Sequence, residues 1–571
     1  MADQTFHIGL CMAGAVSAGA YTAGVMDYLI EALAEWEKRR GEPGVPTHRV
    51  VISVIGGASA GGMTGIITAA AVNQQYQSAT IPLSGQLLAD KADNPFYHSW
   101  VDLLGNDMFS MMLDKTDIEQ TKKVASLMNG NFIDTIASRA ISSNTDAWIP
   151  TPPFFAKTLK VFTTLTNLEG IPYKIGFNSE VLQSQYNMSV HNDYACFNLN
   201  ADTYQQDGWM PLNFKNNINT AIARDAAMAT GAFPIGLKSR LLSRSKKVIM
   251  ENPWLNQTNQ QTTGDEEDIY TTQNIDGGLI NNEPFEKVKQ LLNEITGELD
   301  EVAQHSFNQF KSTVLMIDPF PSELPSSFTT NQQLFVTMGY TLNAITQQMR
   351  AKPVPLINAL AADKAGQFLI APTRPIIDAT NSGKKIEGSK AIACGAFDGF
   401  SGFMQKEFRI HDYFLGRYNC EMFLRNYFTI PAESVQVHPI FSKGYEGVDT
   451  ASFKSFHSNA YQIIPVFKPY QIGYYPMPIF KSGTHWPTIE TNLIDRFEPA
   501  IKKRVEALLL YAFPLGGFWR IVLLIASRLF LNKQVTQKIT GMIKDALLKH
   551  QLIKTSEKNS QINGADGLLK F

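Results

Sequence analysis

One serine of this chain stands in a sequence that can present a nucleophile. Ser59 lies in Gly57–Gly61 (GASAG), a G-x-S-x-G pattern that follows an apolar run and precedes an Ala-rich one. A serine at a sharp strand-to-helix turn is held exposed, and glycines beside it let the backbone close. The N-terminus of the following helix offers free N–H groups to a developing oxyanion. This context favours a nucleophilic Ser59, although the pattern alone is also common as an incidental glycine-rich turn.

The segments around Ser59 predict a parallel sheet covered by helices. Residues 6–11 have the pattern of a first strand, residues 13–19 form a loop of small residues, and apolar residues recur at helical spacing from Val25 to Trp36. The run 50–55 is typical of a strand buried on both faces, and the Ala- and Ile-rich run 63–72 of a buried helix. This order predicts an α/β fold with a mainly parallel central sheet.

The loop 13–19 is expected beside Ser59, because adjacent parallel strands end on the same edge of a sheet. Its backbone N–H groups could then point at the same substrate oxygen. The loop contains neither G-x-G-x-x-G nor G-K-[ST], so a nucleotide-binding interpretation has little support. A single strand–helix unit precedes Ser59, which counts against an α/β-hydrolase, where the serine turn usually follows several strands.

Asp276 is the candidate partner of Ser59. It lies in Asn274–Leu279 (NIDGGL), after residues 269–275, which can form a strand. An Asp followed by two glycines is by itself usually a turn. Upstream, residues 226–234 (AAMATGAFP) predict a helix of small side chains, which must pack close to another element.

Several segments, in chain order over about residues 6–320, resemble the patatin-like phospholipases. They are Gly14–Gly19 in the place of the family's glycine-rich loop, Gly57–Gly61 as its G-x-S-x-G, Lys160–Gly170 as its central strand, Ala229–Gly236 as its small-residue turn, Asp276–Gly278 as its D-G-G, and Asn281–Pro284 after it. The resemblance implies the patatin-like three-layer fold.

The resemblance also implies a catalytic machinery. It implies a Ser-Asp dyad, carried here by Ser59 and Asp276, with no catalytic histidine. It further implies an oxyanion hole made by the backbone of the first loop, here Gly14, Ala15 and Val16. The implied activity is that of a phospholipase A or lysophospholipase-like esterase, which cleaves fatty-acyl esters of a lipid or phospholipid substrate and needs no metal or other cofactor.

The first loop departs from the family's pattern at three positions. The family's second and third glycines are Ala15 and Val16 here, and its basic residue is Ala18. A backbone N–H keeps its direction after such a replacement only if φ is negative at that residue. Two function classes therefore stay open: a lipid acyl hydrolase, which we favour, and a non-catalytic patatin-like module that binds lipid or a partner. An acyltransferase would need a histidine and an arginine near the site, and no motif supplies them.

The composition excludes several classes of protein. With 44% hydrophobic and 18% charged residues the chain does not resemble a disordered protein, and a net charge of -2 gives no basic field for nucleic acid. The four cysteines are far apart with no C-x-x-C, so no disulfide framework or zinc site is predicted. The N-terminus has no signal-peptide pattern, so we expect a cytoplasmic protein.

The domain organisation is predicted from these segments. We expect a catalytic domain over 1–325 with a helical insertion or cap at 74–155, an accessory region packed on it at 326–495, an apolar and basic helical segment at 496–552, and a flexible tail at 553–571. The Met- and Phe-rich insertion is interpreted either as a lid or acyl-binding wall or, more often for such residues, as ordinary core.

The sequence allows two interpretations of the C-terminal segment 507–531. Its apolar stretches are shorter than the roughly 20 residues of a spanning helix, and Pro514 and Arg520 interrupt it. It forms either helices packed on the catalytic domain or a helical hairpin in a membrane interface, where flanking lysines meet anionic head groups. We favour peripheral membrane contact, because a lipase must reach substrate held in a bilayer.

Overall fold

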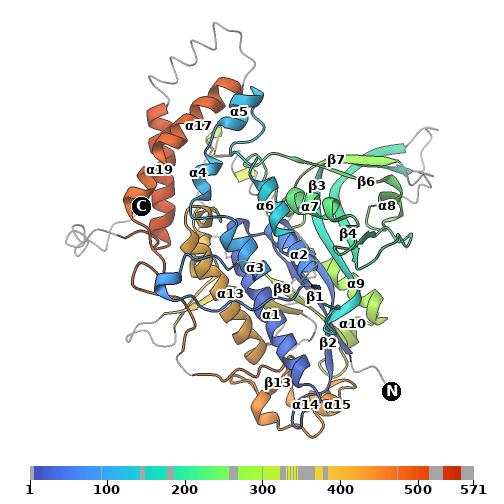
Figure 1. The fold of residues 1–571 in the computed structure, drawn as a ribbon. Helices are drawn as coiled ribbons and strands as arrows, with labels where there is room; N and C mark the ends of the chain where they lie inside the picture. The colour runs from blue at the N-terminus through green and yellow to red at the C-terminus, as the bar shows by residue number, and fades with distance from the viewer. Residues whose placement is uncertain are drawn as a thin grey trace.

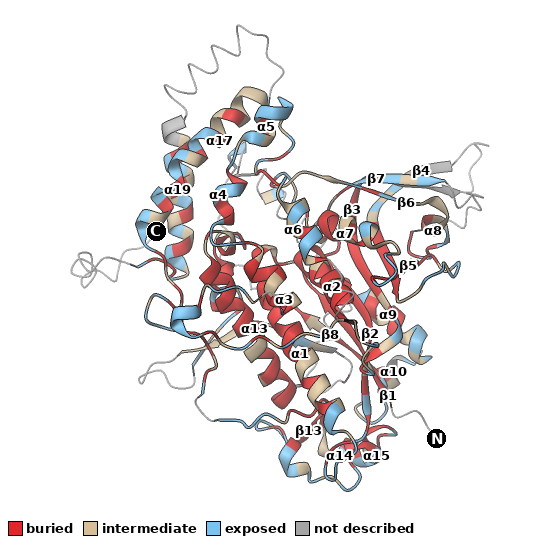
Figure 2. Ribbon diagram, viewed as in Figure 1, coloured by how far each residue is buried: buried red, intermediate tan, exposed pale blue. Residues whose placement is uncertain are grey.

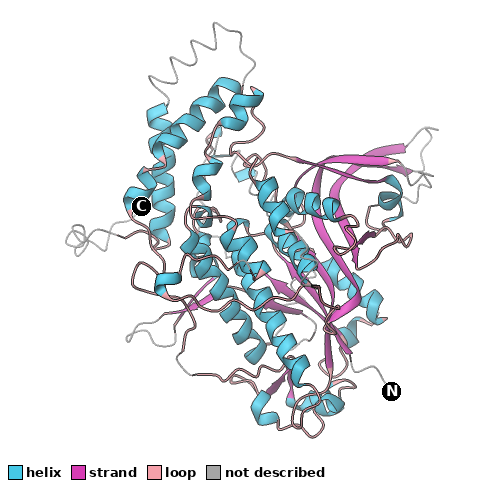
Figure 3. Cartoon of the chain, viewed as in Figure 1, coloured by secondary structure: helices cyan, strands magenta, loops and turns pink. Residues whose placement is uncertain are grey.

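The chain folds around a mixed, mainly parallel β-sheet with helices on either side of it (Figure 1, Figure 3). The structure is a computed structural model that describes residues 5–91, 93–141, 148–176, 185–255, 268–298, 300–321, 365, 367–376, 384–471, 474–512 and 532–554, with isolated positions between 330 and 344. The α/β fold that the order of segments predicts is confirmed.

The main path of the sheet has the strand order β5–β4–β3–β2–β1–β8–β9. These strands are β1 (Thr5–Met12), β2 (Arg49–Gly57), β3 (Phe155–Gly176), β4 (Gln185–Leu199), β5 (Met210–Leu212), β8 (Ser312–Ile317) and β9 (Gln367–Ile370). Neighbours on this path pair in parallel except β3 and β4, which are antiparallel. Two further strands, β6 (Arg240–Ser245) and β7 (Ile269–Asp276), form an antiparallel ribbon that joins the sheet at β3.

Helices cover both faces because the buried strands are apolar on both sides. Along β1, Phe6, Ile8 and Leu10 belong to the core that includes α1 (Gly19–Arg39), α2 (Ser59–Ala71) and α13 (Lys406–Asn426). Cys11, which points the other way, belongs to a second core with Val288 of α9 (Phe285–Thr296). Figure 2 shows the buried residues concentrated in the sheet, α1, α2 and α13. The strands predicted at 6–11 and 50–55, and the helices after them, are confirmed as β1, β2, α1 and α2.

The other helices are short or peripheral. They are α7 (Thr220–Thr230), α8 (Lys246–Glu251), α10 (Glu301–Gln304), α14 (Ala432–Val437), α15 (Phe441–Gly444), α16 (Thr491–Asp495), α17 (Glu498–Tyr511) and α19 (Asn532–Lys549). Two small antiparallel ribbons pair β10 (Thr373–Pro375) with β11 (Lys385–Glu387) and β12 (Thr429–Pro431) with β13 (Ala460–Gln462).

The insertion at 74–155 contributes to the main core. Its helices are α3 (Pro95–Tyr97), a π-helical turn at His98–Asp102, α4 (Met108–Met112), α5 (Thr116–Thr121) and α6 (Ile133–Ala140). Phe96, Trp100 and Phe109 are buried in the same cluster as α1 and α2. The burial of these three residues supports the interpretation that they are ordinary core. The domain boundaries themselves stay predictions.

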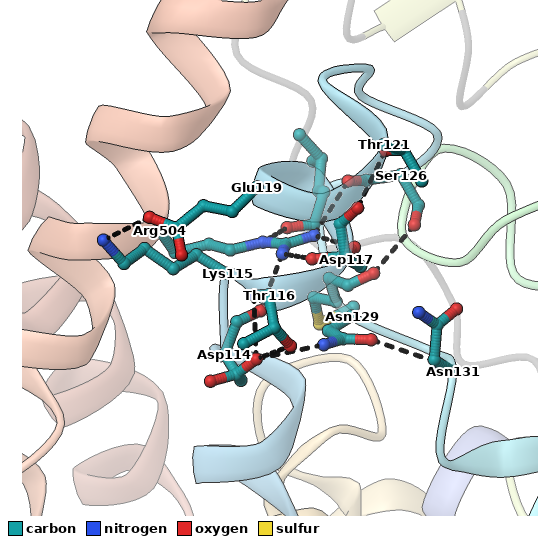
Figure 4. Close-up of polar contacts among 12 residues, drawn as sticks. Asp114, Lys115, Thr116, Asp117, Glu119, Thr121, Ser126, Asn129, Asn131 and Arg504 are labelled. Atoms are coloured by element: carbon teal, nitrogen blue, oxygen red, sulfur yellow. Dashed lines mark hydrogen bonds and ion pairs between the residues drawn. The ribbon is translucent and has the colours of Figure 1, made fainter.

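A buried arginine joins the C-terminal helices to this insertion (Figure 4). The guanidinium of Arg504 on α17 is 2% exposed and donates hydrogen bonds to the carbonyl oxygens of Asp114 (2.7 Å), Leu127 (2.9 Å) and Ser126 (3.2 Å). It also pairs with the carboxylate of Asp117 on α5, with Nη2 and Oδ2 3.0 Å apart. The described part of the C-terminal segment is thus packed on the rest of the chain.

The proposed membrane contact of 507–531 stays a prediction, because residues 513–531 lie outside the described residues, as does most of the tail predicted at 553–571. Within the described ranges, no helix combines the length and the apolar character that crossing a bilayer requires.

Helix α13, from the region predicted to be accessory, packs backbone to backbone on α1. A Cβ on Gly24 of α1 would lie 1.9 Å from the carbonyl oxygen of Tyr413, and a Cβ on Gly416 of α13 would lie 2.1 Å from that of Tyr21. Real side-chain atoms do not approach that closely, so only glycine fits at either position. Helix α13 is therefore part of the main core.

This close approach predicts that Gly24→Ala lowers the free energy of unfolding by about 2–3 kcal/mol, because the added methyl group forces the two helices apart. Gly541→Ala in α19 is the matched control, since a Cβ there meets nothing within 4 Å. The control is expected to stabilise its helix by about 1 kcal/mol. Chemical denaturation measures both changes, and a Gly24→Ala variant as stable as the wild type would contradict the packing.

Candidate active site

Ser59 and Asp276 are brought together by two strands that meet on one edge of β3. β2 runs parallel to β3 and ends with Gly57 opposite Thr163. β7 runs antiparallel to β3 and ends with Asp276 opposite Leu165. At this level β4 occupies the other edge of β3, so β2 and β7 approach each other end to end. The turns after the two strands therefore face each other.

The turn after β2 places Ser59 at the first position of α2. Its φ is 49°, a left-handed conformation that is unusual for a residue other than glycine. The flanking glycines make the turn possible: a Cβ on Gly57 would lie 2.6 Å from the carbonyl carbon of Gly61, and a Cβ on Gly61 2.2 Å from the carbonyl oxygen of Met12. The N–H of Ser59 donates to Oγ1 of Thr230, at the end of α7, over 2.9 Å. This is the strand–turn–helix geometry that the sequence predicts around Ser59.

The carboxylate of Asp276 accepts hydrogen bonds through both of its oxygens. Ser59 Oγ donates to Oδ2 over 2.7 Å, and the N–H of Gly278 donates to Oδ1 over 2.7 Å. The backbone of Asp276 is held as well, since its N–H donates to Ala232 O (2.9 Å) and its carbonyl oxygen accepts from Thr166 Oγ1 (2.8 Å). The side chain thus has little freedom to leave Ser59.

Burial sets the acidity of this carboxyl group. Asp276 is only 5% exposed, and its removal from water raises its pKa to about 6 from the usual 3.8. The hydrogen bonds from Ser59 and Gly278 favour the ionised form and lower the pKa, but by less than burial raises it. Asp276 is therefore a carboxylate with a pKa close to neutrality in hydrogen-bond contact with a serine hydroxyl, which is the arrangement that general base catalysis requires.

The predicted oxyanion loop lies against Ser59. A Cβ on Gly14 would stand 2.9 Å from the Cβ of Ser59. The N–H of Gly14 donates to Oδ1 of Asn282 over 3.2 Å, whereas the N–H groups of Ala15 and Val16 have no hydrogen-bond acceptor among the described residues. Two of the three predicted N–H donors thus have no acceptor among the described residues. The third, the N–H of Gly14, is bonded to the side chain of Asn282.

The two non-glycine residues of this loop differ in conformation. Ala15 has a φ of −153°, which suits any residue. Val16 has a φ of 48°, in the left-handed region that glycine adopts freely and that is strained for a β-branched side chain. The condition of a negative φ is thus met at Ala15 but not at Val16. Because Val16 has a left-handed backbone without being glycine, another part of the structure must hold it there.

Residues 10–289 match the family model described as patatin-like phospholipase. This chain carries a patatin-like phospholipase domain. Family membership indicates a lipid acyl hydrolase. The roles of Ser59 and Asp276 as nucleophile and base stay predictions.

The other comparisons do not add an activity. The chain is 32% identical to the uncharacterized protein y4iI of Sinorhizobium fredii (strain NBRC 101917 / NGR234) over 484 residues, which covers 76% of this chain and 66% of that protein. An alignment with the crystal structure of VipD from Legionella pneumophila covers 96% of this chain and 89% of that one, at 10% identity and a TM-score of 0.20, which is too low to compare the two folds.

The described residues give the candidate site neither a histidine partner nor a metal-binding cluster. All ten histidines are described, and none of them forms a hydrogen bond with Ser59 or Asp276. Burial lowers the pKa of His48 and of His438 to about 4, and each is bonded to a backbone carbonyl away from the site. Over the described part of the chain, no group of three or more His, Cys, Asp or Glu side chains could hold a metal ion.

Sequence reasoning missed the residues that support the two central side chains. Thr230 and Thr166 lie in segments that resemble the family, but nothing in their pattern assigns them a hydrogen-bond role. Asn282 lies in the family-like run after Asp276, and its contact with Gly14 joins residues 268 positions apart. No local pattern in residues 391–402 (AIACGAFDGFSG) indicates a contact with the loop.

The raised pKa predicts that Asp276 destabilises the folded protein at neutral pH. The folded state binds the proton more tightly than the unfolded chain, so the stability linked to this group is fully present below about pH 4 and lost as pH rises to about 6. Asp276→Asn is therefore expected to raise the free energy of unfolding by up to about 3 kcal/mol at pH 8 and by little at pH 4.

Chemical denaturation at the two pH values measures this gain. Asn preserves the acceptor for Gly278 and can donate an amide N–H to Ser59 Oγ, so the contact between the two side chains is kept with its donor and acceptor exchanged. Asp545→Asn, on the exposed side of α19, is the control and is expected to change stability little at either pH. Equal effects of Asp276→Asn at pH 4 and pH 8 would contradict the assigned pKa.

Proposed function

We propose that this protein is a lipid acyl hydrolase of the phospholipase A or lysophospholipase type, with Ser59 as nucleophile and Asp276 as base. The observation that carries the proposal is the 2.7 Å hydrogen bond from Ser59 Oγ to Oδ2 of a buried Asp276. The patatin-like domain supports lipid esters as the substrate class. Unoccupied N–H groups beside the serine support ester hydrolysis over simple binding.

The first half-reaction follows from this geometry. Asp276 accepts the hydroxyl proton of Ser59 while Oγ attacks the carbonyl carbon of the ester, so the C=O π electrons move to the oxygen. In this proposal the N–H groups of Ala15 and Val16 donate to that oxyanion. When the tetrahedral intermediate collapses, the C–O bond to the alcohol breaks, and protonated Asp276 gives its proton to the leaving oxygen. The product is an acyl ester on Ser59.

The second half-reaction uses the same groups in reverse. Asp276 takes a proton from a water molecule while the oxygen of that water attacks the acyl carbonyl carbon. The bond from Ser59 Oγ to that carbon then breaks, the proton returns to Oγ, and the fatty acid leaves. One carboxylate thus serves every proton transfer, which a pKa near 6 allows because the group then exchanges its proton readily near neutral pH.

Ser59→Ala is expected to reduce hydrolysis of a soluble short-chain chromogenic ester by at least about a thousandfold, because only binding and the oxyanion donors remain. The wild type is expected to be labelled by a fluorophosphonate probe at Ser59, and the variant not at all. Circular dichroism checks that the variant is folded. Failure of the folded wild type to react would favour the alternative, a non-catalytic module that binds lipid or a partner.

The pH dependence tests the base. We expect kcat/KM for an uncharged soluble ester to rise as pH increases through an apparent pKa of about 6 and then to level off, because only ionised Asp276 accepts the serine proton. Asp276→Asn should lower kcat by nearly as much as Ser59→Ala. If any single His→Ala variant loses as much activity as Asp276→Asn, the dyad is wrong and a histidine is part of the machinery.

A further inference from the structure

The oxyanion loop is held by a turn that lies more than a hundred residues beyond the family-matched region. The N–H of Ser17 donates to the carbonyl oxygen of Gly399 over 3.1 Å, and Ser17 Oγ donates to the same oxygen. The N–H of Gly402 donates in turn to Ser17 Oγ over 3.1 Å. Ser17 is fully buried, so water cannot replace these partners. The residue after Val16 is thus fixed by three hydrogen bonds to one turn.

The same turn also packs directly on the strained residue. Gly399 has a φ of 91°, and a Cβ on it would lie 3.0 Å from the Cβ of Val16 and 3.5 Å from the carbonyl oxygen of Ala15. The half-buried valine side chain therefore packs against the turn. This contact accounts for a left-handed φ at Val16, because the surrounding structure must over-determine such a conformation for it to persist.

The turn is rigid because α13 holds it at both ends. The carboxylate of Asp412 accepts hydrogen bonds from the N–H groups of Ala393 (2.7 Å) and Cys394 (2.8 Å), and Arg409 donates to the carbonyl oxygen of Gly402. Asp412 and Arg409 are both fully buried. Since α13 packs on α1, and α1 begins at the loop, the loop and its support belong to one rigid unit.

We propose that Ser17 and Gly399 are positioning residues that hold the N–H groups of Ala15 and Val16 in the direction of the oxyanion. This inference rests on the proposed hydrolase function and extends it to a segment outside residues 10–289. Here tertiary contacts from residues 393–403 replace the conformational freedom of the glycines that this loop has in the family. The catalytic unit accordingly includes this turn and α13.

Ser17→Ala tests the proposal. It removes the side-chain hydrogen bonds but keeps the backbone bond to Gly399, so the loop can shift without unfolding. We expect kcat for a soluble short-chain ester to fall by about tenfold to a hundredfold with KM changed less than about twofold, because the donors act on the transition state and not on the bound ester. The inhibition constant of a trifluoromethyl ketone, whose hemiketal oxyanion occupies the same position, should rise by the factor by which kcat/KM falls.

Ser455→Ala is the matched control. Ser455 is also a buried serine that donates to a backbone carbonyl, that of Asn426, and accepts from a backbone N–H, that of His457. It has no contact with the loop, so kcat is expected to stay within about twofold of the wild type. A loss of melting temperature similar to that of Ser17→Ala would show that stability alone does not explain the effect on kcat.

Ser17→Cys gives a graded test that does not depend on the folding of Ser17→Ala. Cysteine keeps a side chain of similar shape with a weaker donor, so its kcat should lie between those of wild type and Ser17→Ala, or simply below wild type if the alanine variant does not fold. The proposal is overturned if Ser17→Cys matches the wild type, if Ser17→Ala loses no more kcat than Ser455→Ala, or if only KM changes. A wild type that fluorophosphonate does not label contradicts the proposed function itself.

Discussion

Two strands that run toward each other along one edge of β3 determine where the candidate chemistry can occur. β2 ends opposite Thr163 and β7 ends opposite Leu165, so only the turns that follow them fit between the strand ends. Ser59 and Asp276 are thus placed by backbone hydrogen bonds of the sheet, before any bond between their side chains is considered. The same crowding requires Gly277 after Asp276, because a Cβ there would lie 2.1 Å from the carbonyl oxygen of Thr164.

This placement has an electrostatic consequence. A carboxylate wedged between strand ends is removed from water, and two hydrogen bonds only partly offset the lost hydration, which is why the pKa of Asp276 is raised. For a base that must both take and return a proton near neutral pH, that shift is useful. For folding it is unfavourable, and the extensive burial in the sheet, α1 and α13 must provide the compensating stability. The burial that destabilises the carboxylate at the site is therefore part of the same packing that stabilises the fold.

Local patterns were enough to predict the elements, and the resemblance was enough to predict the pairing of Ser59 with Asp276. β1, β2 and α2 follow from alternation, β-branched runs and small residues, which act over a few positions in the chain. The support of the site could not be predicted in this way. The bond between Ser17 and Gly399 joins residues 382 positions apart, and neither has a local sequence that indicates chemistry. Valine is typical of strands, so nothing in the sequence predicts a left-handed φ at Val16.

The loop at residues 13–17 shows what replaces glycine when a family position is filled by other residues. The N–H of Ala13 donates to Ile317 O at the end of β8 (3.0 Å), that of Gly14 to Asn282, and that of Ser17 to Gly399. Three separate parts of the chain thus fix the residues on either side of the two unoccupied N–H groups. Alanine and valine have fewer accessible conformations than glycine in the unfolded chain, so less entropy is lost when the loop is ordered. The backbone strain at Val16 opposes this gain in the free energy of folding. The strained conformation persists because the turn at Gly399 belongs to the same core as α1. Such a loop is preorganised if its two N–H groups act as proposed, since contacts elsewhere in the fold then set their direction before substrate binds.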